Sequence, residues 1–337
     1  MKVVITGHMG FIGIWMALYL KKRGYEVFGI DNRSSYGDRL FDLLPKDEIF
    51  SQSVVGDITD ILTLKKFLTS VRPDAVINLA GQAIVPRSFS DPELTFATNA
   101  LGTLNVLAAS SEVATIKTCL CITSDKVYKN NNEDKFFSES DELWGGDIYS
   151  SSKVAAENIA QSFYYAHLKK SMSIHTIRLG NVVGGGDWSV NRLIPDLIRA
   201  YNNNEIFYVR YLSAIRPFQH VLDVVASISN ILDFSLKEVN YSTWNLGPKN
   251  NTFLDVQSVI DIFQSEFGEL DIESDPSTNK EDLKLAILNN KYVDRFSSPV
   301  YDSFESVKAT LQFYKKINKS NAVELCNSEV SIFSNEV

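Results

Sequence analysis

The chain has very few cysteines, and this excludes a disulfide framework as the basis of its fold. It contains three cysteines among 337 residues, and Cys119 and Cys121 lie in an apolar run with no second cysteine pair or histidine cluster beside them. Buried thiols of a protein in a reducing compartment explain this pattern better than metal ligands do. We therefore expect no metal site.

Long hydrophobic runs and blocks of positive charge are also lacking. The N-terminal segment MKVVITG has too short an apolar run for a signal peptide, and no uninterrupted run of about 18 apolar residues follows. The net charge is −8, without a Lys/Arg patch that could follow a phosphate backbone. We expect a cytoplasmic protein that binds neither membranes nor nucleic acid.

The chain does contain a regular alternation of short apolar runs and longer amphipathic segments. Strands are expected at 2–6, 26–30, 53–56, 74–80, 118–123, 174–181 and 243–247. Helices are expected between them, for example at 11–24 and 94–111. Strands that are apolar throughout and alternate with helices indicate a parallel sheet covered on both faces. The prediction is an α/β fold, a doubly wound parallel sheet of the Rossmann type.

A glycine-rich segment, TGHMGFIG at 6–13, follows the first expected strand and opens the first helix. Gly7, Gly10 and Gly13 allow a tight turn, close approach to a pyrophosphate, and close packing of the helix on the strand. The helix N-terminus adds free N–H groups and a positive dipole end. The GxxGxxG spacing alone is equally compatible with an ordinary glycine-rich turn.

Acidic residues after the second and third strands favour a dinucleotide site. Asp31, in GIDNR, can accept hydrogen bonds from a ribose diol, and its charge repels a 2′-phosphate and so favours NAD over NADP. Arg33 would soften this preference, and Asp31 can alternatively cap a turn. Asp57, in GDITD, can accept from an adenine amino group, cap the next helix, or do both.

The pattern changes after Asn181, where a GGGDW loop and further helices follow. We predict an NAD-binding domain at 1–181, to which 217–247 return, and a smaller, mostly helical substrate lobe. That lobe is expected to comprise 182–216 and 248–320. The last residues, 321–337, are rich in Ser, Asn and Glu and are expected to form a flexible tail.

A candidate catalytic set combines three residues. Tyr149 and Lys153, in YSSSK, are four apart and share one helix face, and Ser124 lies at the end of an expected strand. A phenol loses its proton near pH 10, and a nearby ammonium group favours the phenolate and lowers that pKa. Such a tyrosine can take a proton from a sugar hydroxyl while hydride leaves for nicotinamide.

With these motifs the chain resembles the extended short-chain dehydrogenase/reductases that act on nucleotide sugars, the NAD-dependent epimerase/dehydratase family. The likeness extends from residue 1 to about residue 320 and includes LAGQ at 79–82 and TNALGT at 98–103. It implies NAD as cofactor and a homodimer or dimer of dimers formed through 94–111 and 149–168. It also implies cofactor contacts from Phe11, Ile12, Asn32, Ile58, Leu79, Ala80, Gln82 and Asn99, besides Tyr149 and Lys153.

Within that family the chain is most similar to the CDP-glucose 4,6-dehydratase branch. The likeness rests on TSDKVY at 123–128, GNVVGGGDWSVNRLIPD at 180–196 and AIRPFQHVLD at 214–223. The implied reaction oxidises C4 of the sugar, eliminates water across C5 and C6, and returns the hydride to C6, as a step toward a deoxysugar for a surface polysaccharide. Alternatives are a dehydratase or 4-epimerase of UDP-, dTDP- or GDP-sugars, and a non-catalytic NAD-binding sensor.

Oxidation at C4 makes the C5 proton acidic, so elimination needs a base for C5 and an acid for the C6 hydroxyl. We assign Asp125 as the acid and Lys126 as the provisional base, and each role requires a shifted pKa. Lys126 can instead act electrostatically, and the pair can be a surface ion pair. The strand must end near Ser124 for both side chains to face one sugar ring.

The resemblance places Asn181, Arg192 and Arg216 near the diphosphate and the ribose, where Arg offers a bidentate fork. Surface salt bridges are the alternative for both arginines. Further expected substrate residues are Trp188, which can stack on a base or pack the lobe, and His220, which can instead be a hydrogen-bonded core residue. Gln82 and Ser88 are expected to line the sugar pocket.

Overall fold

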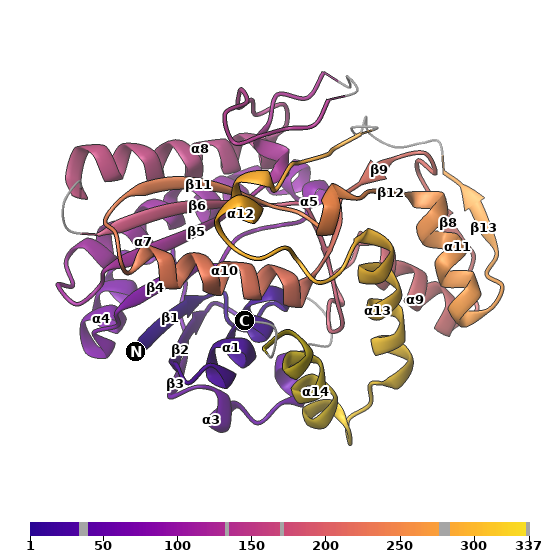
Figure 1. Cartoon of the computed structure of the whole chain (residues 1–337), viewed down its shortest axis with the longest axis horizontal. Helices are drawn as coiled ribbons and strands as arrows, with labels where there is room; N and C mark the ends of the chain where they lie inside the picture. Colours follow the sequence, from indigo (N-terminus) through magenta and orange to yellow (C-terminus); the bar gives the residue numbers. More distant parts are fainter. Residues whose placement is uncertain (34–39, 132–134, 169–171, 276–283, 335–337) are drawn as a thin grey trace.

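The computed structural model (Figure 1) describes residues 1–337 apart from 34–39, 132–134, 169–171, 276–283 and 335–337. Its centre is a seven-stranded sheet with the order β11-β6-β5-β4-β1-β2-β3, in which every neighbouring pair is parallel. The strands are β1 (Lys2–Thr6), β2 (Glu26–Asp31), β3 (Gln52–Val55), β4 (Ala75–Asn78), β5 (Thr118–Ser124), β6 (Ser173–Leu179) and β11 (Tyr241–Leu246). The predicted doubly wound α/β fold is confirmed.

Helices cover both faces of this sheet. On one face Val3 and Ile5 of β1 pack with α1 (Phe11–Lys22) and α10 (Val221–Ser235). On the other face Val4 packs with helices α4 (Ile61–Val71), α7 (Gly102–Ser111) and α8 (Ile148–Phe163). Because successive side chains of a strand point to opposite faces, strands buried on both faces must be apolar throughout.

The segment from 92 to 111 differs from the single helix predicted for 94–111. It consists of α6 (Pro92–Phe96), a π-helical turn η1 (Ala97–Leu101) and α7. π-Helical turns are rare and are frequently found at functional sites. The turn carries Asn99, whose side chain faces the loop after β4.

A smaller lobe lies over the carboxyl edge of the sheet and has its own apolar core (Figure 1). Its main helices are α9 (Leu193–Asn203), α11 (Val256–Phe267) and α13 (Ser303–Lys316). Short strands outside the central sheet pair two by two. The pairs are β7 (Asn181–Val183) with β10 (Phe218–His220), β8 (Phe207–Val209) with β13 (Ile272–Ser274), and β9 (Ile215–Arg216) with β12 (Leu254–Asp255). The remaining short elements are α2 (Leu40–Leu43), α3 (Lys46–Ile49), α5 (Val85–Ser90), η2 (Asp125–Val127), η3 (Tyr164–Leu168), η4 (Lys249–Asn251) and α12 (Asn290–Arg295).

The expectation of a flexible tail at 321–337 is wrong for most of that segment. Residues Ala322–Ser334 form the helix α14, which packs on α1 and α10. Cys326, Val330 and Phe333 are each no more than 2% exposed. They follow one another at helical spacing, so the many polar residues of this segment lie on the other side of the helix.

No helix in the part of the chain that the structure describes is long and apolar enough to cross a membrane. The same residues contain no group of three or more His, Cys, Asp or Glu side chains placed to hold a metal ion.

Candidate active site

The glycine-rich loop joins β1 to α1 and packs closely against neighbouring backbone. Gly7 has φ +73°, and a methyl group there would lie 2.7 Å from the amide nitrogen of Ala80. A methyl group at Gly13 would lie 2.1 Å from the carbonyl oxygen of Gly7. No side chain caps α1 at Gly10, and its first turn carries no acidic residue. The first N–H groups of the helix can therefore bind a pyrophosphate.

Replacing Gly13 by alanine is expected to weaken NAD binding by roughly tenfold or more, which corresponds to about 1.4 kcal/mol. The added methyl group would push the Gly7 carbonyl and separate the loop from the helix. Titration of the apoprotein with NAD, followed by calorimetry, measures the change. Gly146→Ala is the control, because its methyl group would meet nothing closer than 3.7 Å. Equal affinities for the two variants would contradict this role of Gly13.

Asp31 ends β2 beside the glycine-rich loop. Its carboxylate accepts hydrogen bonds from the amides of Met9 at 3.1 Å and Arg33 at 2.7 Å. Arg33 itself has φ +57° and is exposed, with Asp42 3.8 Å from its guanidinium group. Asp31 thus caps the turn, as the alternative interpretation proposed.

Asp57 does not cap the following helix, because Asp60 is the residue that caps α4. Asp57 accepts instead from Asn32 Nδ2 at 2.8 Å and from the amide of Thr59 at 2.8 Å. Burial raises the pKa of Asp57, but these hydrogen bonds outweigh it and hold that pKa below its ordinary value. Ile58 is 4% exposed and packs on Gly102.

The loop after β4 is fixed by its own side chains. Asn99 accepts from the amide of Gln82 at 2.9 Å and donates to its carbonyl oxygen at 3.0 Å. The Gln82 side chain donates a hydrogen bond to Thr95 and accepts one from the amide of Ile84, so its polar atoms have partners inside the protein. A methyl group at Gly81, between Leu79-Ala80 and Gln82, would lie 3.1 Å from Lys153 Nζ. The loop therefore lies against the candidate catalytic lysine.

The strand that carries Ser124 ends there, as predicted, and a single 3₁₀ turn, η2, follows. Ser124 Oγ donates to Asp125 Oδ1 at 3.1 Å and accepts from the amide of Lys126 at 3.2 Å. Asp125 is 3% exposed, whereas Lys126 is half-buried. Because the extended conformation stops, Asp125 and Lys126 no longer have to point to opposite faces.

Tyr149 and Lys153 lie in the first turns of α8, which Asp147 caps. The Tyr149 phenol is hydrogen-bonded with Ser124, so the structure brings these two predicted residues together. Burial lowers the pKa of Lys153 to about 8. Its ammonium group donates to the carbonyl oxygen of Ile122 at 3.3 Å.

The expected lowering of the Tyr149 pKa by Lys153 is not found. Burial raises the pKa of Tyr149, and the bond with Ser124 and the charge of Arg192 only partly oppose this. The charge of Arg192 thus lowers the pKa of the Tyr149 phenol, a role that had been expected of Lys153.

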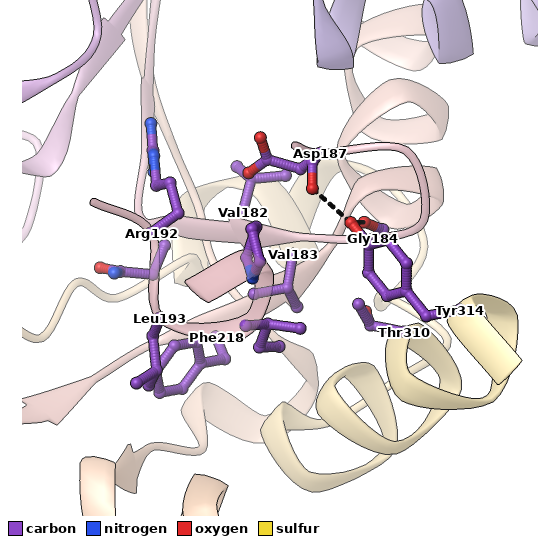
Figure 2. Close-up of a pocket in the computed structure, with 12 residues that line it drawn as sticks. Val182, Val183, Gly184, Asp187, Arg192, Leu193, Phe218, Thr310 and Tyr314 are labelled. Carbon is purple, nitrogen blue, oxygen red and sulfur yellow. Dashed lines mark hydrogen bonds between the residues drawn. The ribbon is translucent and has the colours of Figure 1, made fainter. Parts of the chain in front are cut away.

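A small cavity of about 40 Å³ opens beyond β7 (Figure 2). Its lining residues are Asn181, Val182, Val183, Gly184, Asp187, Arg192, Leu193, Ile194, Pro195, Phe218, Thr310 and Tyr314. The structure therefore brings together Asn181 and Arg192, as predicted for a diphosphate site. Arg216 is not among these residues; it is 5% exposed and donates to the carbonyl oxygen of Ile215.

Two further candidates, Trp188 and Ser88, contact other protein groups. The Trp188 ring meets Tyr314 edge-on with ring centroids 4.9 Å apart, which favours the lobe-packing alternative. Ser88 is fully buried, and its hydroxyl donates to the carbonyl oxygen of Val85.

His220 does not lie in a substrate site, and its predicted contact with substrate is therefore withdrawn. It is 3% exposed, its Nδ1 accepts from the amide of Leu222 at the start of α10, and its ring stacks on Phe333 of α14. The core alternative describes it, because a buried ring that caps a helix has no free face.

Burial lowers the pKa of His220 from 6.5 to about 3. Below pH 6.5 the unfolded chain binds a proton that the folded chain refuses, so stability falls as the pH falls. The His220→Asn variant keeps a capping oxygen but does not titrate. Urea unfolding measures the free energy of unfolding of both proteins between pH 6 and pH 4. As the pH falls, this free energy should decrease less steeply in the variant than in the wild type, and the two slopes should differ by about 1.4 kcal/mol per pH unit. Equal slopes would contradict this account.

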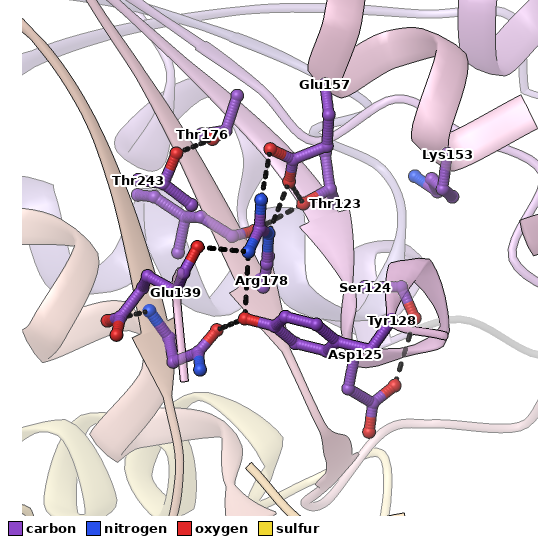
Figure 3. A network of polar contacts seen from close by, with 12 residues as sticks. Thr123, Ser124, Asp125, Tyr128, Glu139, Lys153, Glu157, Thr176, Arg178 and Thr243 are labelled. Atoms are coloured by element: carbon purple, nitrogen blue, oxygen red, sulfur yellow. Dashed lines mark hydrogen bonds and ion pairs between the residues drawn. The ribbon is translucent and has the colours of Figure 1, made fainter. Parts of the chain in front are cut away.

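One group of functional interest escaped the sequence prediction. Thr123, Glu157 and Arg178 form a buried polar network directly behind the catalytic candidates (Figure 3). The sequence does contain a sign of this network: Arg178 lies inside the apolar strand IHTIRL, and Glu157 follows Lys153 by four residues.

With this geometry described, comparison with known proteins shows the family. A model of the NAD dependent epimerase/dehydratase family matches residues 3–247. CDP-glucose 4,6-dehydratase of Salmonella typhimurium is 32% identical over 276 residues, which cover 80% of this chain and 77% of that protein. GDP-mannose 4,6-dehydratase of Vibrio cholerae serotype O1 is 40% identical over 111 residues, covering 32% of this chain and 30% of that protein.

Solved structures agree with the fold. UDP-glucose 4-epimerase of Thermus thermophilus in complex with NAD has a TM-score of 0.82 at 21% identity, covering 94% of this chain and 100% of that chain. dTDP-glucose 4,6-dehydratase of Bacillus anthracis in complex with NAD has a TM-score of 0.78 at 21% identity, covering 97% and 99%. The predicted family and its cofactor are confirmed: the chain belongs to the NAD dependent epimerase/dehydratase family, a family of enzymes.

Proposed function

We propose that the chain is a nucleotide-sugar 4,6-dehydratase that converts CDP-glucose to CDP-4-keto-6-deoxyglucose. One observation carries the reaction type: Asp125 is held at 3% exposure beside Ser124, which itself meets Tyr149. A 4-epimerase needs only the oxidation at C4 and has no leaving hydroxyl that requires an acid. The choice of CDP-glucose is supported by the 32% identity to a CDP-glucose 4,6-dehydratase.

The residues around the glycine-rich loop fit NAD. Gly7 and Gly13 leave no room for a side chain, and Asp31 lies next to them at the end of β2. The diphosphate would bind the start of α1, and a ribose would bind Asp31. NAD, when bound, supplies the acceptor for the hydride from C4 and the donor that returns it to C6.

The side chains of the chain handle the protons. Tyr149, assisted by Ser124, takes the proton of the C4 hydroxyl as C4 becomes a ketone. Lys126, the proposed base, then removes the C5 proton while Asp125 protonates O6, the C6–O bond breaks, and water leaves. A proton returns to C5 as C6 is reduced, so the net change is the loss of one water.

Asn181 and Arg192 are proposed to bind the diphosphate of the sugar nucleotide. Both line the cavity beyond β7. Arg192 also lies close enough to Tyr149 for its charge to act on the phenol. A substrate bound there by its diphosphate would place its sugar toward Ser124 and Tyr149.

Incubation with CDP-glucose, without added cofactor and followed by mass spectrometry, tests this function. The expected product is one water lighter than the substrate. UDP-, dTDP- and GDP-sugars in parallel incubations test the choice of nucleotide. A product of unchanged mass with inverted C4 would show a 4-epimerase and overturn the proposal.

We also propose that two copies of the chain associate through α7 and α8. Large apolar side chains remain exposed on and before α7, with Phe89 at 51%, Leu101 at 47% and Leu104 at 38%. Such a grouping of exposed apolar residues is typical of an interface. Light scattering of the purified chain should give the mass of a dimer or a dimer of dimers.

A further inference from the structure

A buried polar network lies behind the candidate active site (Figure 3). Each of its five side chains is no more than 5% exposed: Thr123, Tyr128, Glu157, Arg178 and Asn245. They come from β5, the residue after η2, α8, β6 and β11. The network therefore joins elements that are far apart in the sequence, and three of these elements carry or adjoin the catalytic candidates.

One arm joins the end of β5 to the catalytic helix. Arg178 donates to both carboxylate oxygens of Glu157, each at 3.0 Å. Thr123 Oγ1 donates to the same carboxylate at 2.5 Å. Thr123 directly precedes Ser124, and Glu157 lies one helical turn beyond Lys153. This arm fixes the strand end relative to the helix that carries the catalytic tyrosine and lysine.

The other arm holds the turn that carries Asp125 and Lys126. Arg178 Nη1 donates to the hydroxyl of Tyr128 at 2.8 Å, and that hydroxyl donates to Asn245 Oδ1 at 2.6 Å. The amide of Tyr128 bonds to the carbonyl oxygen of Asp125, closing the turn. The turn is thus fastened at its start by β5 and at its end by Tyr128.

A buried ion pair is a weak source of stability compared with apolar packing of similar volume. The Arg178–Glu157 pair, at 4% and 2% exposure, is therefore better explained by what it orients. Its hydrogen-bonded neighbours, Thr123 and Tyr128, flank the 124–127 segment on both sides. This is the segment in which the proposed acid and base must be placed to within a fraction of an ångström.

We propose that Tyr128 is a positioning residue whose hydroxyl, through Arg178, fixes the Asp125–Lys126 turn relative to α8. This inference deepens the proposed function and rests on it. C4 oxidation uses Ser124 and Tyr149, which the other arm positions through Thr123 and Glu157. Loss of the Tyr128 hydroxyl should therefore slow water elimination more than it slows C4 oxidation.

The Tyr128→Phe variant tests this, because it removes one hydroxyl and keeps both the ion pair and the ring stack on Phe137. Elimination should slow on the order of 10- to 100-fold, with C4 oxidation and KM near those of the wild type. After mixing with CDP-glucose, reduced nicotinamide should accumulate, which near-ultraviolet absorbance detects. Single-turnover mass spectrometry should show the lighter product appearing late.

A readout without cofactor or substrate accompanies the kinetics. In the cofactor-free variant, hydrogen exchange of the backbone amides of 126–128 should be faster than in the wild type. Tyr241→Phe is the matched control, since its hydroxyl lies 3.4 Å from Thr243 on β11 and makes no bond to the turn. We expect the control to match the wild type in both measurements.

A second pair of variants examines the other arm. Thr123→Ser keeps a hydroxyl for Glu157 and should keep the rate of C4 oxidation, whereas Thr123→Val removes it and should lower that rate. If Thr123→Val does not fold, Tyr128→Phe still decides the proposal.

Unchanged exchange at 126–128 in Tyr128→Phe, or equal slowing of oxidation and elimination, would overturn the positioning role. Failure of the proposed function looks different, because the wild type itself would then yield no lighter product. In that case the hydrogen-exchange measurement still decides whether Tyr128 holds the turn.

Discussion

Replacing Tyr149 by phenylalanine is expected to lower turnover of the sugar nucleotide by roughly 10²- to 10⁴-fold, the usual contribution of a general acid–base group. The phenol is 6% exposed and hydrogen-bonded with Ser124, so it is placed to take a proton from a substrate hydroxyl. Because the variant loses one oxygen from a helix that Asp147 still caps, the fold should be retained.

Initial rates with saturating CDP-glucose measure the loss, and calorimetric titration with NAD checks that cofactor affinity remains. Tyr165→Phe is a matched control, because Tyr165 is 56% exposed and lies at the far end of the same helical segment. A Tyr149→Phe variant that keeps more than about a tenth of wild-type turnover would assign the proton transfer to another group.

The fold could be predicted because the inner strands of the sheet are buried on both faces. A run such as DAVINLA is apolar at successive positions, and the matching strand β4 is fully buried. The glycine-rich loop and the Tyr-x-x-x-Lys pair could also be predicted, because their residue spacings follow from the geometry of a single turn and a single helix.

Properties that depend on burial in the folded protein could not be predicted from the sequence. The Tyr149 pKa was expected to fall beside Lys153, but burial raises it, and burial is set by elements distant in sequence. For His220 the sequence favoured a core role but left a substrate contact open, and Phe333 of α14, stacked on its ring, decides for the core. That helix itself was missed because its polar residues dominate the composition while its apolar residues form a narrow stripe.

Asp125→Asn is expected to abolish most of the water elimination, by about 10²-fold or more, while C4 oxidation continues. Asparagine has nearly the same shape, and its Oδ1 can still accept from Ser124 as Asp125 Oδ1 does at 3.1 Å. It has no acidic proton to give to the C6 hydroxyl. The variant should therefore hold the sugar as the 4-ketone with reduced nicotinamide, detected by its absorbance and by the mass of the quenched sugar.

The fate of the C5 hydrogen then separates the acid from the base. If Asp125 is the acid and Lys126 the base, Asp125→Asn should still exchange C5–H for deuterium from heavy water, because Lys126 is unchanged. The control is Asp255→Asn, in which asparagine can still cap α11, and it should release water as the wild type does. Normal elimination by Asp125→Asn would refute the acid role, whereas elimination and C5 exchange lost together would show that Asp125 serves the base step as well.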